Sequence, residues 1–580
     1  MHRNGKLKLP SWAGALVLWA APLAFLGVFY LYPLVNILKI SFTHSDRAVS
    51  PLIQALSSRS IQHVLWFTVW QAILSTALTL LLGLPGAYLM ARYDFRGKAL
   101  VQALSGIPFV LPTLVVAAAF NALLGPRGWV NLALMALLKT TQPPVTFVNS
   151  LSAILIAHVF YNTTIVLRLV GDFWAHLDPH LGQAARMLGA NKWQELRYVS
   201  LPLLAPAITA AALLVFIFVF TSFGVILVLG GPRFATLEVE IYNQTLSLFN
   251  LPIAAALSII QLICTLVFSI IYTRRVKHLA RPLSLHPRRY TQHKLSNWRE
   301  KILAGALIAL LLGLLTTPLA ALAARSFTRF EAERGQHTLV NASVTLDFYK
   351  ELLINRRQSV FYIPPVRAIG VSFSYAAITV ILALALGFPA AWALSRDSKE
   401  QKSPIDYINQ ILDPLLMLPL GTSAVTMGLG FLVALGRPPL DLRASPILVP
   451  LAHTLVAFPF VVRSLTPALR SIRPRLRQAA AVMGAPPLQV LRQIDLPLTG
   501  RAIIVAATFA FTISLGEFGA TAMISRPEFP TIPVAIYRFI SQPGALNYGQ
   551  ALALSTILMA VTAAGMLVIE RLRIADIGEF

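Results

Sequence analysis

Cysteine and charged residues are scarce in this chain. Its 580 residues include one cysteine, Cys264, and only 12% are Asp, Glu, Lys or Arg. A single cysteine excludes an intrachain disulfide bond and any metal cluster built on several cysteines. Hydrophobic residues make up 56% of the chain, with a mean hydropathy of +0.69, which is more apolar surface than soluble domains of ordinary size can bury. We therefore predict an integral membrane protein whose main solvent is the lipid bilayer.

Two features that an ATP-hydrolysing enzyme needs are also missing. The phosphate-cradling motif G-x-x-x-x-G-K-S/T does not occur in the sequence. No polar segment is long enough to form an ATPase domain, and the few His, Asp and Glu residues are scattered rather than clustered as in a catalytic site. We therefore predict that the chain is not an enzyme and binds no cofactor or metal of its own.

Basic residues outnumber acidic ones by 48 to 23, which gives a formal net charge of +25. A nucleic-acid-binding protein would gather these residues on one soluble face, but here they occupy short segments between apolar runs, so we expect no nucleic-acid partner. The densest segment is the linker at residues 281–300, and others lie at the two termini. By the positive-inside rule these segments are cytoplasmic, together with both termini.

Apolar runs of about 20 residues, enough to cross a bilayer, recur along the whole chain. They are expected near residues 13–38, 66–91, 102–124, 151–171, 203–229, 252–273, 302–324, 370–395, 411–435, 447–465, 500–524 and 550–570. The predicted fold class is therefore an all-α polytopic membrane protein with about 12 transmembrane helices.

The two halves of the sequence repeat one design. Eight identical residue pairs lie 295 positions apart: His158 and His453, Arg168 and Arg463, Pro179 and Pro474, Gln183 and Gln478, Gly189 and Gly484, Pro202 and Pro497, Thr236 and Thr531, Tyr242 and Tyr537. We predict a first repeat at residues 1–280 and a second at residues 301–580. Because each contains an even number of spans, the two enter the membrane in the same orientation and are related by an axis along the membrane normal.

A short polar segment with helix-capping residues occurs once in each repeat, near residues 173–202 (the first loop) and 467–497 (the second loop). In the first loop, Asp178 and Pro179 favour the start of a short helix and Gly189 its left-handed end. Asn191 then caps a second helix, with Gln194 completing a capping box. The second loop repeats the pattern with prolines and a glycine, so we predict two rigid helix-turn-helix segments on the cytoplasmic face.

The residues around each glycine resemble a known motif. The motif begins with Gln183, Ala184 and Ala185; Gly189 follows after three residues, and Leu201-Pro202 come at its end. This pattern is similar to the cytoplasmic "EAA" loop of binding-protein-dependent ABC importer permeases. The same pattern returns in the second loop as Gln478, Ala479, Ala480 and Gly484. With its two repeats, the chain resembles the fused permeases of thiamine and ferric-iron importers.

This resemblance implies a type I ABC importer permease fold in the cell membrane of a prokaryote. In that family the loop contains a coupling helix that docks in a groove of an ATPase subunit. The implied partners are two ATPase subunits, which use ATP and Mg, and an extracytoplasmic substrate-binding protein, whereas no second permease chain is required. The binding protein is expected to dock on residues 126–150 and 326–369. The implied mechanism is ATP-driven alternating access.

Both motifs depart from the family pattern at their first position, where Gln replaces the usual Glu. A carboxylate can form an ion pair with a basic residue of the ATPase, whereas Gln183 and Gln478 offer a neutral hydrogen bond about half as strong. An ion pair between this position and the ATPase subunit is therefore not expected, but docking of the loop on that subunit still is.

Three residues are candidates for the substrate path. Glu517 lies within an apolar span, where a carboxylate is costly, and the first repeat has Val225 at the point we consider equivalent. Tyr242 and Tyr537 lie at the outer ends of the two repeats. One carboxylate with aromatic faces suits an organic cation such as thiamine, and carboxylate and phenol oxygens suit ferric iron. Alternatively, Glu517 is a helix-end carboxylate bound by a neighbouring amide, and the tyrosines are interfacial anchors.

His158 and His453 are expected to be packed, hydrogen-bonded side chains rather than metal ligands. A secondary transporter with two parallel six-helix halves is the alternative to an ABC importer. It would need coupling-ion sites near the midplane, and no paired acidic or basic residues recur there.

Overall fold

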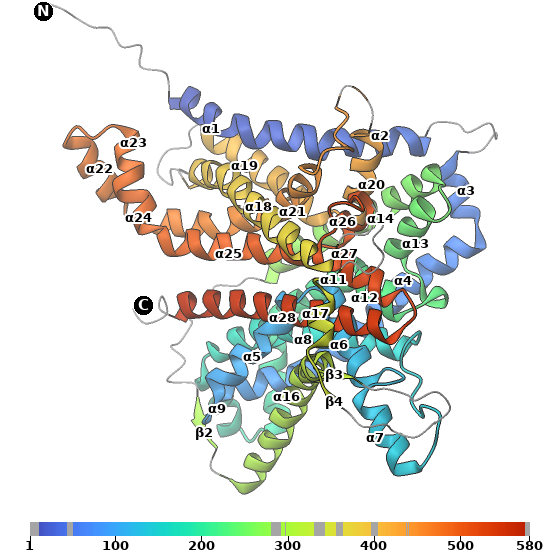
Figure 1. Ribbon diagram of the computed structural model, residues 1–580. Coiled ribbons are helices and arrows are strands. Elements are labelled where there is room, and N and C mark those ends of the chain that lie inside the picture. Colours follow the sequence, from blue (N-terminus) through green and yellow to red (C-terminus); the bar gives the residue numbers. More distant parts are fainter. Residues whose placement is uncertain are drawn as a thin grey trace, which may run out of the picture. The chain divides into compact units, whose positions relative to one another are not determined.

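Nearly all regular structure in the computed structural model is helical, as Figure 1 shows. The structure describes residues 11–42, 50–279, 292–295, 297–329, 343–354, 364–395, 404–436, 438 and 440–574. The described strands have two residues each: β1 (Tyr93–Asp94) pairs in parallel with β2 (His293–Lys294), and β3 (Thr328–Arg329) pairs antiparallel with β4 (Ser343–Val344). The predicted all-α class is confirmed. The basic residues 1–10 and most of the predicted linker, 281–291, lie outside the described residues.

The chain divides into two compact units, and each is described by itself. The first comprises Met1–Thr43, Asn355–Val534 and Ala564–Phe580. Its helices are α1 (Ser11–Leu26), the π-turn η1 (Gly27–Leu31), α2 (Tyr32–Phe42), α18 (Pro365–Leu394), α19 (Pro404–Met417), η4 (Leu418–Gly421), α20 (Ala424–Ala434), α21 (Leu448–Ser471), α22 (Pro474–Val482), α23 (Pro487–Val490), the π-turn η5 (Leu491–Asp495), α24 (Leu496–Leu498), α25 (Gly500–Gly516) and α26 (Gly519–Ile524).

The second unit comprises His44–Ile354 and Ala535–Ala563. Its helices are α3 (Pro51–Ser57), α4 (Arg59–Arg92), α5 (Lys98–Val110), α6 (Thr113–Leu124), α7 (Trp129–Leu138), α8 (Leu151–Ala175), α9 (Pro179–Met187), α10 (Lys192–Glu195), the π-turn η2 (Leu196–Ser200), α11 (Leu201–Phe220), α12 (Gly224–Leu229), η3 (Pro232–Phe234), α13 (Leu237–Leu246), α14 (Leu251–Leu279), α16 (Trp298–Ser326) and α17 (Asp347–Glu351). The unit boundaries fall within α27 (Ile532–Ile540) and α28 (Ala545–Ile574).

The number of membrane-spanning helices agrees with the prediction. Among the described residues, ten helices are long and apolar enough to cross a bilayer. Two further helix pairs pass the same test together but are sharply bent, by 95° between Asn409–Gly421 and Ala424–Ala434, and by 73° between Pro487–Leu498 and Gly500–Gly516. Counting each bent pair once gives twelve spans, so the chain is a polytopic helical membrane protein.

Some predicted spans are wrong in detail because proline and polar breaks interrupt them. The expected span 102–124 is two helices, α5 and α6, and the apolar span consists of Thr113–Leu138. Pro112 restricts the residue before it, and Leu111 is accordingly extended, with ψ 138°. The expected spans 203–229 and 500–524 also break, after Phe220 and Gly516 respectively.

Each unit contains helices from both halves of the sequence. In the first unit, α1 packs on α18 and α2 packs on α20, and Figure 1 shows the rod of α1 and α2 beside α19 and α20. In the second unit, α16 packs on α6 and α5. The first span of each predicted repeat therefore packs against helices from the other repeat. The division into repeats at residues 280 and 301 remains a prediction about the sequence.

Close helix packing on glycine recurs in both units. In the second unit α4 packs on α8, and a Cβ at Gly83 would lie 2.7 Å from the Cβ of Val166. In the first unit α18 packs on α21, and a Cβ at Gly387 would lie 2.6 Å from Cγ1 of Val461. Val166 and Val461 are 295 positions apart, so the same small-residue contact joins the equivalent helices of the two repeats.

Candidate functional site

The first loop folds as its capping residues predict. The Asp178 carboxylate accepts a hydrogen bond from the backbone N–H of His180 at 2.9 Å, and α9 begins at Pro179. Gly189 has φ +91° and ends the helix in the left-handed conformation. Asn191 and Gln194 then form a reciprocal capping box at α10, with bonds of 2.8 and 2.9 Å. The π-turn η2 continues into α11.

The second loop has the same geometry. Helix α22 begins at Pro474, Gly484 has φ +80°, and α23 begins at Pro487 after the cap residue Pro486. The π-turn η5 then continues into α24. The predicted helix-turn-helix segments are therefore confirmed in both repeats.

The alanines of the two motifs help to end their helices. The carbonyl of Ala185 accepts the N–H of Ala190 at 3.1 Å, and the carbonyl of Arg186 accepts the N–H of Gly189 at 2.9 Å. The equivalent bonds in the second loop, from Ala485 to Ala480 and from Gly484 to Ala481, are both 3.0 Å. This double bonding is the Schellman motif, which fixes the chain direction after the helix.

An exposed apolar pair precedes each glycine. The exposed fractions are 88% for Met187 and 90% for Leu188, and 89% for Val482 and 81% for Met483. These pairs occupy equivalent positions in the repeats. Large apolar side chains that are this exposed on a rigid turn are typical of a surface that a partner covers. Gln183, Ala184, Gln478 and Ala479 are exposed beside them, whereas Ala480 is buried.

Each loop also contains an ion pair that the sequence analysis missed. In the first loop, Arg186 binds Glu195, with Nε 2.6 Å from Oε2. In the second, Arg477 Nε lies 2.8 Å from Oδ1 of Asp495, whose Oδ2 accepts the indole N–H of Trp392 at 2.9 Å. Both carboxylates are buried, so each pair ties the first loop helix to the segment after the glycine.

The two ion pairs occupy different positions of the repeat. Arg477 and Asp495 correspond to Gly182 and Ser200 by the offset of 295 residues. In the first loop a Cβ at residue 182 would meet the Glu195 carboxylate, so that carboxylate would have to shift if the residue were larger than glycine. The signal was therefore visible in the sequence as two paired substitutions between the repeats, Gly182 to Arg477 and Ser200 to Asp495.

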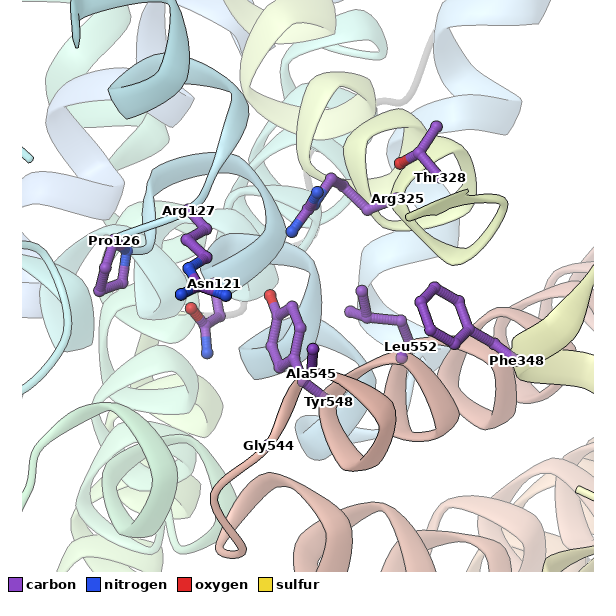
Figure 2. A pocket seen from close by; sticks show the side chains of 11 residues that line it. Asn121, Pro126, Arg127, Arg325, Thr328, Phe348, Gly544, Ala545, Tyr548 and Leu552 are labelled. Carbon is purple, nitrogen blue, oxygen red and sulfur yellow. The ribbon is translucent and has the colours of Figure 1, made fainter. Parts of the chain in front are cut away.

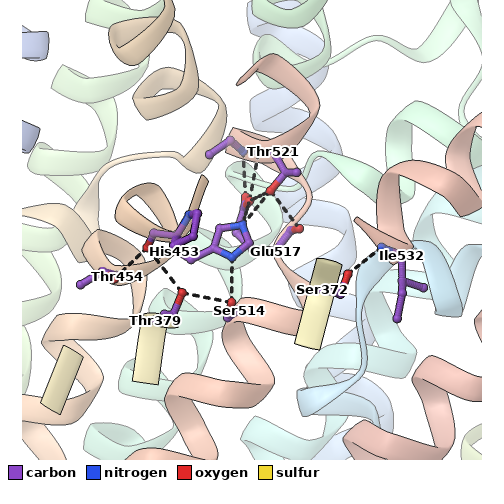
Figure 3. A network of polar contacts seen from close by, with 10 residues as sticks. Ser372, Thr379, His453, Thr454, Ser514, Glu517, Thr521 and Ile532 are labelled. Carbon is purple, nitrogen blue, oxygen red and sulfur yellow. Dashed lines mark hydrogen bonds and ion pairs between the residues drawn. The ribbon is translucent and has the colours of Figure 1, made fainter. Parts of the chain in front are cut away.

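Glu517 lies at the break between α25 and α26 in a buried polar network, shown in Figure 3. Its carboxylate accepts the N–H groups of Ala520 and Thr521 at 2.8 and 3.0 Å and the Thr521 hydroxyl at 2.5 Å. His453 Nε2 lies 3.3 Å from Oε2 of Glu517. This geometry is that of a helix-capping carboxylate, the alternative interpretation given above. Its role in the substrate path stays a prediction.

The two histidines are packed and hydrogen-bonded, as expected. His453 Nδ1 lies 2.8 Å from Ser514 Oγ, and His158 Nδ1 lies 3.2 Å from Ser75 Oγ. His158 Nε2 lies 2.9 Å from Ser222 Oγ. Among the described residues, no group of three His, Cys, Asp or Glu side chains is placed to hold a metal ion.

This arrangement corrects the expected counterpart of Glu517. Ser222, at the offset of 295 residues, precedes α12 as Glu517 precedes α26, and each contacts the histidine of its own repeat. The interpretation of Val225 as equivalent was wrong because it aligned the Ser-x-Gly letters instead of the helix starts. At this position the two repeats therefore differ, with Ser222 in the first and Glu517 in the second.

Tyr242 and Tyr537 come together in the second unit. Their side chains hydrogen-bond each other, and the Tyr242 ring lies 5.3 Å from that of Phe223. These tyrosines are 295 positions apart and so are equivalent residues of the two predicted repeats.

Comparison with known proteins identifies the class to which this fold and its paired loops belong, the membrane component of an ABC importer. Residues 83–281 match the family of binding-protein-dependent transport system inner membrane components. Over these residues the chain is similar to that family, and the comparisons support a permease subunit of an ABC importer in a multi-pass membrane protein.

Its relatives match over most of their length. The thiamine transport system permease protein of Escherichia coli strain K12 is 27% identical over 84% of this chain and 85% of its own. That of Brucella abortus strain 2308 is 28% identical over 87% and 86%. A probable ABC transporter permease protein of Sinorhizobium fredii is 26% identical over 99% of this chain and 98% of its own.

Proposed function

We propose that each glycine-centred loop docks on one ATPase subunit and couples ATP hydrolysis to the import of thiamine. The observation that carries the docking proposal is the pair of exposed apolar side chains before each glycine, Met187 with Leu188 and Val482 with Met483. Burying such a side chain in a partner's groove is worth about 1.5–3 kcal/mol. Four of them, at equivalent positions, suit two copies of one partner. Gln183 and Gln478, exposed beside the pairs, would add neutral hydrogen bonds to the groove.

The same loops suit the transmission of movement. The Schellman bonds at Gly189 and Gly484 and the two Arg-carboxylate pairs leave each loop few internal degrees of freedom. A rigid loop moves as a body with the ATPase, and the π-turns η2 and η5 pass directly into the helices α11 and α24. Closure of an ATPase dimer on ATP would therefore rock the attached helices, open the path outward, and reopen it inward after hydrolysis.

The substrate path is proposed to run along the axis marked by Tyr242 and Tyr537. Their hydrogen bond brings together equivalent residues of the two predicted repeats, which supports this placement. Their rings offer faces that attract an organic cation. Glu517 is retained as a path residue in this proposal, acting through the His453 network rather than as a free carboxylate.

Thiamine is favoured as the substrate because relatives in two organisms are thiamine transport system permease proteins. It is an organic cation, which suits the aromatic pair at the axis. Ferric iron, the other substrate expected from the resemblance, would be delivered to the same path. A substrate-binding protein would dock on the extracytoplasmic segments, residues 126–150 and 326–369, of which 330–342 and 355–363 lie outside the described residues.

The proposed assembly contains this chain, two ATPase subunits that use ATP and Mg, and one binding protein. Both termini face the cytoplasm, with the two loops, in the cell membrane of a prokaryote. No second permease chain and no cofactor on this chain are required.

The test is ATP hydrolysis by the complex reconstituted in proteoliposomes, with thiamine and ferric iron offered in turn through the binding protein. Stimulation by thiamine is expected. A double variant, Met187→Asp with Leu188→Asp, should lose ATPase association, whereas Val344→Asp, equally exposed in β4, should keep it. Stimulation by ferric iron alone would replace the substrate. Full ATPase association by the double variant would overturn the docking proposal.

A further inference from the structure

A cavity of about 450 Å³ lies in the second unit, apart from the loops and the polar network described above. Its wall is formed by the ends of α6 and α16, the start of α28, and side chains of the neighbouring turns, as Figure 2 shows. Part of its lining lies in the segments 126–150 and 326–369, on which the binding protein is proposed to dock, and no other step of the proposed transport cycle uses these residues.

Two arginines give the cavity its chemistry. Arg325, in the last turn of α16, is only 5% exposed, and Arg127 lies in the exposed turn after α6. Figure 2 shows both guanidinium groups directed toward the space beside the Tyr548 hydroxyl. The two positive charges repel each other across this space. None of the lining residues that the structure describes is acidic.

Neutral donors and a helix terminus add to the positive potential. The amide of Asn121 and the hydroxyl of Tyr548 line the cavity, as does the start of α28 at Gly544 and Ala545. The N-terminus of a long helix attracts anions, and this one has no acidic residue in its first turn. Gly544 has φ +121°, a conformation that lets the chain turn sharply into the helix beside the cavity.

The depth of the cavity in the membrane is set by α16. Arg325 follows Trp298 by 27 residues, which is about 40 Å of helix and therefore the distance from one headgroup layer to the other. Trp298 follows the basic linker that is predicted to be cytoplasmic, so Arg325 reaches the outer headgroup layer. Phe348 and Leu552 provide an apolar wall beside the arginines.

We propose that this cavity binds a phosphate group, which Arg127 and Arg325 hold together with the Tyr548 hydroxyl. A guanidinium group can donate hydrogen bonds to two phosphate oxygens at once. The two arginines could therefore both bind one phosphate group placed between them. The phosphate belongs either to the headgroup of an anionic phospholipid of the outer leaflet or to a phosphorylated solute at the membrane surface. In either case it joins α6, α16 and α28 and removes the repulsion between the arginines.

The test uses the purified permease with its ATPase subunits in detergent, stripped of lipid. The midpoint of thermal unfolding is measured with inorganic phosphate, with dioleoylphosphatidylglycerol, and with dioleoylglycerol, which lacks the phosphate. Arg127→Gln changes an exposed residue and should leave folding intact, and Arg325→Lys keeps the buried charge but loses the two-point geometry. Arg233→Gln, an exposed arginine of the same unit, is the matched control.

Stabilisation by phosphatidylglycerol but not by dioleoylglycerol or inorganic phosphate would identify a lipid headgroup, and stabilisation by inorganic phosphate would identify a solute. In both cases Arg127→Gln should weaken the apparent affinity about tenfold, while Arg233→Gln leaves it unchanged. No stabilisation by either phosphate source would overturn the proposal. So would an unchanged response of both cavity variants.

Discussion

Both carboxylate oxygens of Glu517 accept hydrogen bonds from the first turn of α26. This buried carboxylate also contacts a hydroxyl group and a histidine. It therefore caps the start of α26 in addition to carrying a charge. In the first repeat Ser222 occupies this place with one contact to His158. The second repeat therefore holds its helix break more firmly than the first.

Replacing Glu517 should separate its two roles. We expect Glu517→Ala to lower the free energy of unfolding by about 2 kcal/mol, because it removes the cap and leaves the N–H groups of Ala520 and Thr521 unsatisfied. Ser222→Ala should cost less than half as much. The measurement is thermal unfolding of both variants in detergent, beside transport. Lost transport with an unchanged unfolding temperature would instead assign Glu517 to the substrate path alone.

The ion pairs of the two loops should differ in importance. The side chain of Asp495 is 1% exposed, so Arg477→Ala would leave a buried charge and cost about 3–5 kcal/mol locally. Arg186 is 54% exposed and the Glu195 side chain 10%, so water can reach this pair more easily and Arg186→Ala should cost less than Arg477→Ala. ATPase activity stimulated by the binding protein should therefore fall much further in Arg477→Ala. Equal losses would contradict this ranking, and Arg477→Lys provides the control that keeps the charge.

Local residue roles were predictable where they depend on neighbours in sequence. Asp178, Gly189, Asn191 and Gln194 act within a few residues of their own positions, and the structure confirms each. The ion pairs were not predicted because they depend on the angle between two short helices. For Asp495 they also depend on Trp392, which lies 103 residues away in the chain.

Among the elements, the two loops combine open space with a restricted backbone. A Cβ at Gly189 or Gly484 would meet no atom within 4 Å, yet both residues have φ near +85°. Substitution is therefore limited by the backbone alone, at roughly 1–2 kcal/mol for an ordinary side chain.

This distinction gives a paired test of the loops. Gly189→Val and Gly484→Val should uncouple ATP hydrolysis from transport while the permease still inserts in the membrane. Gly189→Asn and Gly484→Asn should retain most coupling, because asparagine tolerates the left-handed region. Hydrolysis and uptake are measured in the same proteoliposomes. Normal uptake by both valine variants would exclude the rigid-loop mechanism.

Element type was predicted better than element continuity. Hydropathy shows where the apolar segments lie, but it does not show where the helix within a segment breaks or bends. The breaks at Pro112 and at Glu517 interrupt segments that remain apolar on both sides. Proline and a capping carboxylate set these breaks, and their effect depends on whether neighbouring helices accommodate the freed backbone groups.

For the whole molecule, the central finding is that each compact unit draws helices from both repeats. The buried face of α2 packs on α20, where a Cβ at Gly430 would lie 3.0 Å from Pro33 and 3.2 Å from Ile37. Helix α16 packs on α6 and also on α4, where a Cβ at Gly86 would lie 3.0 Å from Cδ1 of Leu311. Neither repeat contains all the partners that its own helices need. This exchange of helices could not be predicted from the apolar spans or from the 295-residue offset between the repeats, because both describe each repeat separately.

Splitting the chain tests this dependence. Fragments 1–286 and 287–580, expressed together, should assemble and restore transport, because packing rather than the peptide bond joins them. Either fragment alone should be degraded. The measurement is copurification through a tag on one fragment, with uptake by the assembled pair. Two fragments that are each stable alone and do not copurify would contradict the exchange of helices.

The same exchange of helices means that some packing partners are synthesised long after the helices that they contact. About 380 residues separate Phe42 at the end of α2 from Ala424 at the start of α20. At roughly 5–20 residues per second, α2 waits about 20–80 s in the bilayer before its partner emerges from the ribosome. Its inner face, with Pro33, Ile37 and the hydroxyl of Ser41, is covered meanwhile by lipid or by the insertion machinery. A ribosome that stalls within the second repeat thus releases a product whose oldest helix is still unpartnered, which gives membrane proteases a means to recognise an unfinished chain.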